Sequence, residues 1–126
     1  MSEPLRGVVF AHADLARALV GAVREIVGES AGLMAVSNAG GDRAALAQRL
    51  EEAVGGGPAL VFADLAGGSC ASVASAVARG RPGLRVVTGV NLPMLLEFAF
   101  HRDEGPDAAA RRAALSGRAA VKEVGP

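Results

Sequence analysis

The sequence predicts an α/β fold, in which a mainly parallel sheet lies between two layers of helices as a three-layer sandwich. Short apolar runs rich in β-branched residues alternate with longer stretches of helical period, as in successive βαβ units. A length of 126 residues and a hydrophobic content of 51% suit one domain with its own core. We therefore expect a single domain over residues 1–126.

Four apolar runs are predicted to be strands. Their nearly continuous hydrophobic character is typical of parallel strands that are buried on both faces. The runs are Gly7–Ala11, Leu33–Ser37, Leu60–Ala63 and Leu84–Thr88.

The first predicted helix, about Asp14–Val27, has an amphipathic period and ends at Gly28. The apolar residues expected on its buried face are Leu15, Leu19, Val23 and Ile26. Asp42 is expected to cap a second helix that ends in the Gly55–Gly57 turn. Its expected core residues are Leu46, Leu50 and Val54. A third helix is expected from about Ser69 to Gly80.

Two further helices and a short strand are predicted in the last third of the chain. Asn91 is expected to cap a fourth helix that buries Leu95 and Phe98. Asp107 is expected to cap a fifth helix that ends at Ser116. The weakly patterned segment Ala119–Val124 is expected to be an edge strand.

Charge and composition exclude several classes of partner. Thirteen basic and thirteen acidic residues cancel, so no net field attracts nucleic acid or anionic lipid. No apolar stretch suits a signal peptide or membrane insertion. Cys70 is the only cysteine, which excludes an internal disulfide and favours a cytoplasmic location. Two histidines and one cysteine form no evident ligand cluster, so we expect no metal and no cofactor.

Residues that immediately follow the strands are the candidates for chemistry, because ligands of parallel sheets bind beyond the carboxyl ends of the strands. His12 follows the first strand and Asp64 follows the third. A carboxylate that accepts a proton from one imidazole nitrogen leaves the lone pair of the other nitrogen free to attack. We therefore predict that His12 is a nucleophile and that Asp64 is its catalytic partner.

The segment after Asp64 can hold an anion. Gly67 and Gly68 allow close backbone approach, and Ser69 opens a helix whose amides and hydroxyl can bind phosphoryl oxygens. The sequence has no Walker lysine motif for nucleotide phosphates. These residues favour metal-free phosphoryl transfer through His12.

Each candidate also has a structural interpretation. A histidine at a strand end is more often a structural residue, an aspartate there is usually a turn residue, and Gly-Gly-Ser is usually a loop. Cys70 can be a thiol nucleophile paired with His12 or a small buried hydrophobic residue, and the second interpretation is favoured. His101, at the end of a predicted helix, is assigned no chemistry.

Three separate segments carry a family resemblance: VVFAHADLA at 8–16, DLAGGS at 64–69 and VTGVNLPML at 87–95. In these segments, and nearly from end to end, the chain resembles the IIA domain of the mannose-type (mannose/fructose/sorbose) sugar phosphotransferase system. The resemblance implies a sheet in the order 2-1-3-4 and a C-terminal antiparallel strand that is exchanged in a homodimer, here about a hinge at Gly117.

The resemblance also implies a function. His12 would accept a phosphoryl group from the phosphohistidine of the carrier HPr and pass it to a IIB domain or protein. Asp64 would orient the ring, and Gly67, Gly68 and Ser69 would hold the phosphoryl oxygens. Such a transfer depends on positioning and charge stabilisation.

Three residues depart from the family pattern. Ala66 stands where an aromatic residue is usual, Cys70 where proline is usual, and Ala13 where glycine is common. Ala66 leaves the identity of the IIB partner open. The alternatives are a regulatory phosphoacceptor not coupled to sugar uptake, a carrier feeding dihydroxyacetone kinase, which ranks third, and a non-catalytic anion-binding or assembly module.

Overall fold

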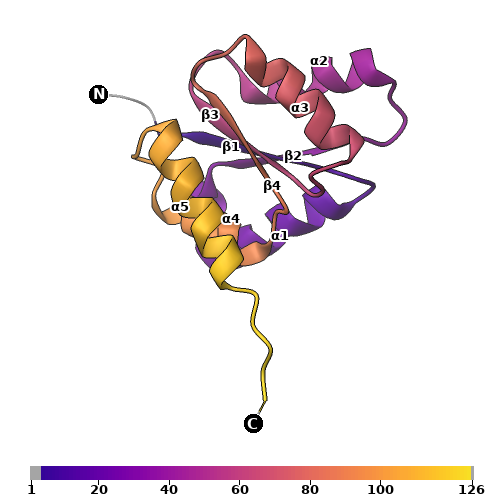
Figure 1. Cartoon of the computed structure of the whole chain (residues 1–126). Helices are drawn as coiled ribbons and strands as arrows, with labels where there is room; N and C mark the ends of the chain where they lie inside the picture. The colour runs from indigo at the N-terminus through magenta and orange to yellow at the C-terminus, as the bar shows by residue number, and fades with distance from the viewer. Residues whose placement is uncertain (1–3, 126) are drawn as a thin grey trace.

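The computed structural model describes residues 4–125 and has three layers (Figure 1). A central sheet separates α2 and α3 on one face from α1, α4 and α5 on the other. In chain order the elements are β1 (Arg6–Ala11), α1 (Leu15–Val27), the 3-10 turn η1 (Glu29–Ala31), β2 (Leu33–Ser37), α2 (Arg43–Val54), β3 (Ala59–Ala63), α3 (Ser69–Arg79), β4 (Leu84–Thr88), α4 (Leu92–Phe100) and α5 (Pro106–Ala119).

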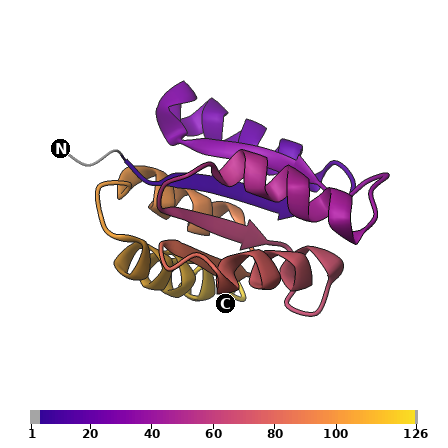
Figure 2. The same ribbon diagram turned by 90° about the horizontal axis from the view of Figure 1, so that it is seen from above.

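The sheet has the strand order β2-β1-β3-β4, and each neighbouring pair is parallel (Figure 2). The predicted α/β class and the order 2-1-3-4 are therefore confirmed. Because β1 and β3 are neighbours, their carboxyl ends meet at the same edge of the sheet. Among residues 4–125, no helix is both long and apolar enough to cross a membrane.

The two central strands carry the core. Alternate residues of a strand point to opposite faces. Val9 and Phe62 accordingly pack in the layer of α1, α4 and α5, whereas Phe10 and Val61 pack in the layer of α2 and α3. All four side chains are buried, so the ends of β1 and β3 project from a rigid platform.

Gly7 permits close packing of α4 on the sheet. A Cβ atom at Gly7 would lie 2.6 Å from Cε2 of Phe98, a distance that side chains do not tolerate. The Phe98 ring therefore lies directly over β1, and it meets Phe62 edge-to-face with ring centroids 5.3 Å apart. The period of α4 predicted that Phe98 is buried, but nothing in the sequence identified Gly7 as its partner.

Two predicted caps are confirmed. Asp42 accepts a hydrogen bond from Ala45 N–H at the start of α2, and Asn91 accepts one from Met94 N–H at the start of α4. Gly89, in the left-handed conformation with φ of 74°, turns the chain from β4 toward that cap. This geometry explains most of the VTGVNLPML segment as structural.

The predicted buried face of α1 is partly wrong. Val23 is fully buried, but Leu15 and Ile26 are 44% and 58% exposed. Ala16 and Val20 take the core positions instead. Leu19 is partly buried and packs against the core, so the buried face is displaced by about one residue from the predicted face.

The predicted cap of α5 is also wrong. Gly105 is the N-cap, and Pro106 is the first helical residue, a position that suits proline because no N–H is needed there. Asp107 lies in the first turn, where its carboxylate interacts favourably with the helix dipole.

The end of the chain differs from its prediction as well. α5 continues beyond Ser116 through Ala119, and Gly117 is not a hinge but a buried helical residue. A Cβ atom there would lie 2.7 Å from Cε of Met94, and the Gly117 carbonyl accepts a hydrogen bond of 3.0 Å from Asn91 Nδ2. Residues 121–125 are exposed and form no strand in the single chain. Pairing of this tail with a second chain stays a prediction.

Candidate active site

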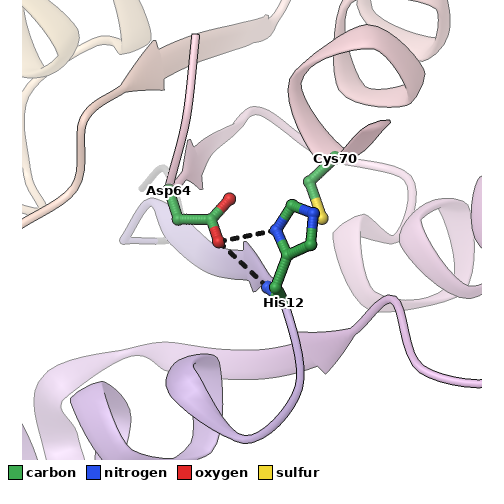
Figure 3. A group of neighbouring side chains, drawn as sticks. All are labelled: His12, Asp64 and Cys70. Atoms are coloured by element: carbon green, nitrogen blue, oxygen red, sulfur yellow. Dashed lines mark hydrogen bonds and ion pairs between the residues drawn. The ribbon is translucent and has the colours of Figure 1, made fainter. Parts of the chain in front are cut away.

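His12 and Asp64 meet where β1 and β3 end (Figure 3). One carboxylate oxygen, Asp64 Oδ2, lies 2.8 Å from His12 Nδ1 and 3.0 Å from the backbone N of the same residue. The His12 side chain is 42% exposed, whereas that of Asp64 is 9% exposed. When the ring is neutral, this contact places the proton on Nδ1 and leaves the lone pair of Nε2 free.

The Asp64 carboxylate is held in its charged form. Burial alone raises its pKa, but hydrogen bonds from the His12 backbone N–H and ring, together with attraction to the ring, outweigh burial and leave the pKa of Asp64 below its ordinary value. The second oxygen, Oδ1, is buried and has no hydrogen-bond partner among residues 4–125. An ionised carboxylate, with one oxygen lacking a hydrogen-bond partner, therefore lies beside Nδ1 of the ring.

The lowered pKa of Asp64 predicts a pH-dependent contribution to stability. A carboxyl with a lowered folded-state pKa stabilises the fold above its ordinary pKa of 3.8, and this contribution is lost as pH falls through the lowered value. We expect the free energy of unfolding of the wild type to lose a component in this acidic range that Asp64→Asn lacks. Urea unfolding of both proteins at a series of pH values measures it, and parallel pH profiles would contradict the prediction.

The start of α3 borders the His12 ring. A Cβ atom at Gly68 would lie 3.2 Å from His12 Cε1, so the glycine lets the helix approach the imidazole. The first bond of the helix runs from Ser72 N–H to the Gly68 carbonyl, which leaves the amides of the preceding turn without intrahelical partners. Ser69 and Gly67 are exposed, and Gly67 has open space where a side chain would lie. These amides and the Ser69 hydroxyl are available to an anion beside the ring.

Cys70 also lies beside the pair (Figure 3). Burial, followed by repulsion from the charge of Asp64, raises the pKa of the thiol to about 11. A fully buried thiol of high pKa is a poor nucleophile, which supports the interpretation of Cys70 as a small buried residue. One nitrogen, oxygen or sulfur atom from each of His12, Asp64 and Cys70 nevertheless lies within 4.8 Å of the others. That no metal is bound stays a prediction.

Two residues that support the histidine were not predicted from the sequence. Ser37 Oγ donates to the Ala13 carbonyl at 2.7 Å, and Asn38 Oδ1 accepts from Ala13 N–H at 3.2 Å. Both residues lie where β2 ends, so the strand-end rule that identified His12 and Asp64 could have found them. They hold the residue after His12 and thereby the direction in which the ring leaves β1.

Ala13 adopts a conformation that favours glycine. Its φ is 51°, the only positive value at a non-glycine residue between positions 4 and 125. We expect Ala13→Gly to raise the free energy of unfolding by about 0.5–1 kcal/mol, because glycine removes the left-handed strain at some entropic cost. Ala18→Gly, at an exposed position inside α1, is the matched control and should lower stability by about 1 kcal/mol. A loss of stability in both variants, measured by urea unfolding, would contradict the assignment of strain.

His101 lies at the opposite end of the molecule from His12. It is the C-cap of α4, and its Nδ1 lies 3.0 Å from the Glu97 carbonyl oxygen. The next residue, Arg102, donates to the Leu5 carbonyl before the start of β1, whereas His12 follows the end of that strand. His101 therefore belongs to a helix terminus rather than to the site.

The fold and the site together define an α/β domain that presents an oriented, accessible histidine beside the N-terminus of a helix. The family model described as the PTS (phosphotransferase system) fructose IIA component, EIIA-man, matches residues 7–115. The chain therefore belongs to the mannose-type IIA family, whose members are components of the sugar phosphotransferase system.

Solved structures agree with this assignment. The mannose/sorbose-specific IIA subunit from Enterococcus faecalis is 30% identical, with a TM-score of 0.84 over 98% of this chain and 97% of that one. The phosphotransferase system component EIIA from Streptococcus agalactiae is 22% identical, with a TM-score of 0.88 over 94% of this chain and 96% of that one. The PTS IIA protein associated with the fucose utilization operon of Streptococcus pneumoniae is 19% identical, with a TM-score of 0.75 over 98% and 96%. The last two similarities concern the fold. No curated protein sequence matches the chain.

Proposed function

We propose that this chain is a phosphohistidine carrier: His12 Nε2 accepts a phosphoryl group from the phosphohistidine of HPr and passes it to a IIB partner. The contact of 2.8 Å between His12 Nδ1 and Asp64 Oδ2 carries the proposal. It directs the Nε2 lone pair outward and sets a negative charge where the ring becomes positive as Nε2 bonds to phosphorus. We place this exchange in the cytoplasm, in keeping with a lone cysteine that forms no internal disulfide.

The start of α3 supports the phosphoryl group in this proposal. The free amides of the first turn and the Ser69 hydroxyl donate to the negative oxygens, and the positive end of the helix dipole favours them. No covalent bond to the protein other than that of Nε2 is needed, because phosphoryl transfer proceeds through a loose transition state.

The surroundings of the site suit a protein partner. Leu15 and Leu65 are 44% and 56% exposed, and both lie within three residues of the two catalytic candidates. Exposed leucines beside a reactive histidine are typical of a contact surface. Ala66 is also exposed and replaces the aromatic residue usual in the family. We propose that this smaller side chain alters the contact surface and thereby affects which IIB protein binds.

Incubation with phosphorylated HPr tests the function. The carrier forms an acid-labile, base-stable phosphoryl label on the wild-type chain, and addition of a mannose-type IIB protein removes it. A regulatory phosphoacceptor acquires the label without releasing it to any IIB protein. A non-catalytic binding module acquires no label, which would overturn the proposal.

We also propose a homodimer in which the C-terminal tail of each chain pairs with the sheet of the other. Among residues 4–125, β4 has a strand neighbour on one side only, and Val121 and Val124 are 79% and 93% exposed. Exchange of such a segment replaces solvent contacts at an open edge with a ladder of hydrogen bonds.

Removal of residues 121–126 is expected to convert the dimer to a monomer and to lower the melting temperature. This truncation leaves α5 and the contact between Asn91 and Gly117 intact, so it isolates the tail. Light scattering measures the mass, and thermal unfolding measures the stability. A full-length chain that is monomeric at high concentration would show that the tail does not pair.

A further inference from the structure

The side chains of His12, Asp64 and Cys70 form one compact group of donors (Figure 3). One nitrogen, oxygen or sulfur atom from each lies within 4.8 Å of the others. His12 follows β1, Asp64 follows β3, and Cys70 lies in the first turn of α3. Because all three are attached to regular elements with a buried core beneath them, their spacing is maintained by the fold.

One acceptor atom in this group has no partner. The Asp64 side chain is more than nine-tenths buried and ionised, yet its Oδ1 has no hydrogen-bond partner among residues 4–125. A buried, unpaired carboxylate oxygen is costly. The backbone N–H and the ring of His12 both reach Oδ2 rather than Oδ1, and the Cys70 thiol is at most a weak donor.

We propose that His12, Asp64 and Cys70 bind Zn²⁺, and that the bound ion blocks the phosphoryl-accepting nitrogen. Imidazole nitrogen, carboxylate oxygen and thiolate sulfur are the three donor types that zinc uses in proteins. Zinc–ligand bonds of about 2.0–2.3 Å place tetrahedral donors roughly 3.3–3.7 Å apart, so the group closes on the ion by movements of about 1 Å. The exposed side of the His12 ring leaves the fourth position to water.

Coordination changes the protonation of the site. The ion forms one bond to a ring nitrogen of His12, one to a carboxylate oxygen of Asp64 and one to Sγ of Cys70. The thiol proton leaves to solvent, because a coordinated thiol is deprotonated. A bond from Nε2 uses the lone pair of that nitrogen directly. A bond from Nδ1 displaces the Nδ1 proton, and the ring then carries its proton on Nε2. In both cases the imidazole stays neutral and Nε2 has no lone pair for phosphorus. Zinc binding and phosphorylation of His12 therefore exclude each other.

The proposed zinc binding requires a cysteine at position 70, so it is restricted to chains that carry this residue. Proline is usual at that position in the family that the sequence resembles, and proline offers no donor atom. The inhibitory effect rests on the proposed carrier function, whereas metal binding does not. The two can therefore be tested separately.

Cobalt(II) tests the binding site without any phosphoryl transfer. Because Cys70 is the only cysteine, a cobalt–thiolate charge-transfer absorption band reports that residue alone. We expect the band in the wild type, its loss in Cys70→Ala, and its removal by Zn²⁺ in equimolar amount. Zinc affinity should fall at least about tenfold in His12→Gln and Asp64→Asn and stay unchanged in the matched control His101→Gln.

Circular dichroism of each variant establishes that it is folded. No band in the folded wild type at saturating cobalt, or a zinc affinity that Cys70→Ala leaves unchanged, would overturn the site.

Zinc sensitivity of labelling tests the inhibitory effect. Equimolar Zn²⁺ should abolish phosphorylation of the wild type by phosphorylated HPr, and a chelator should restore it. Cys70→Ala should be labelled within a few-fold of the wild-type rate and resist the same zinc concentration. Equal inhibition of both proteins would overturn the inhibitory effect. Failure of the metal-free wild type to acquire label would instead overturn the carrier function and leave the cobalt result unaffected.

Discussion

Replacement of His12 with alanine is expected to abolish the acid-labile label that phosphorylated HPr transfers to this chain. The imidazole presents a nitrogen lone pair at the joined ends of β1 and β3, and the contact with Asp64 directs that lone pair outward. No neighbouring group replaces it, because Cys70 is buried and its pKa is raised to about 11. Labelling is measured by electrophoresis before and after acid treatment.

His101→Ala is the matched control, because it removes the other histidine. We expect full labelling of this variant, since His101 caps α4 beside Glu97 and lies at the amino end of the sheet. Circular dichroism should show that both variants are folded. Label retained in His12→Ala, or lost equally in both variants, would refute the assignment of His12.

The sequence predicted the strands of the sheet and the pairing of His12 with Asp64. Strands follow from local apolar runs, and the pairing follows from the general rule that the residues after parallel strands share one edge. Buried strands are continuous apolar runs, and the residues after them share one edge. His12 and Asp64 could therefore be paired from the sequence alone, although they are 52 positions apart. The caps Asp42 and Asn91 were predictable for the same reason, since each bonds an amide only three residues away.

What the sequence did not predict depends on close approach between distant segments. The helical period of α1 fits either Leu15 or Ala16 on the buried face, and the structure places Ala16 there and leaves Leu15 44% exposed. Gly117 is predicted as a hinge, but it lies inside α5, where the absence of a side chain lets Met94 and Asn91 approach the helix.

The convergence of Cys70 with His12 and Asp64 is a further example. Cys70 follows Asp64 by six residues, and the turn between them brings the start of α3 beside the ring, where Gly68 has no side chain to obstruct the approach. Ligand spacing in the sequence gave no sign of this cluster. Donor groups on three elements are visible only when the elements are placed in space.

The second large effect is expected from Asp64→Asn, which should slow phosphoryl transfer to His12 by about 100-fold or more while leaving the chain folded. The amide is nearly identical in shape, and its oxygen can still accept from the His12 backbone N–H and from Nδ1–H. It lacks the negative charge that stabilises the ring as Nε2 bonds to phosphorus and the imidazole becomes cationic.

The expected slowing is measured by rapid-quench transfer from phosphorylated HPr in a single turnover, which separates the chemical step from partner binding. Asp64→Ala should be slower still, because it loses both the charge and the acceptor that orients the ring. The order wild type, Asn, Ala therefore separates charge from orientation. A wild-type rate in Asp64→Asn would contradict the prediction, because the hydrogen bonds that Asn preserves would then be sufficient without the negative charge.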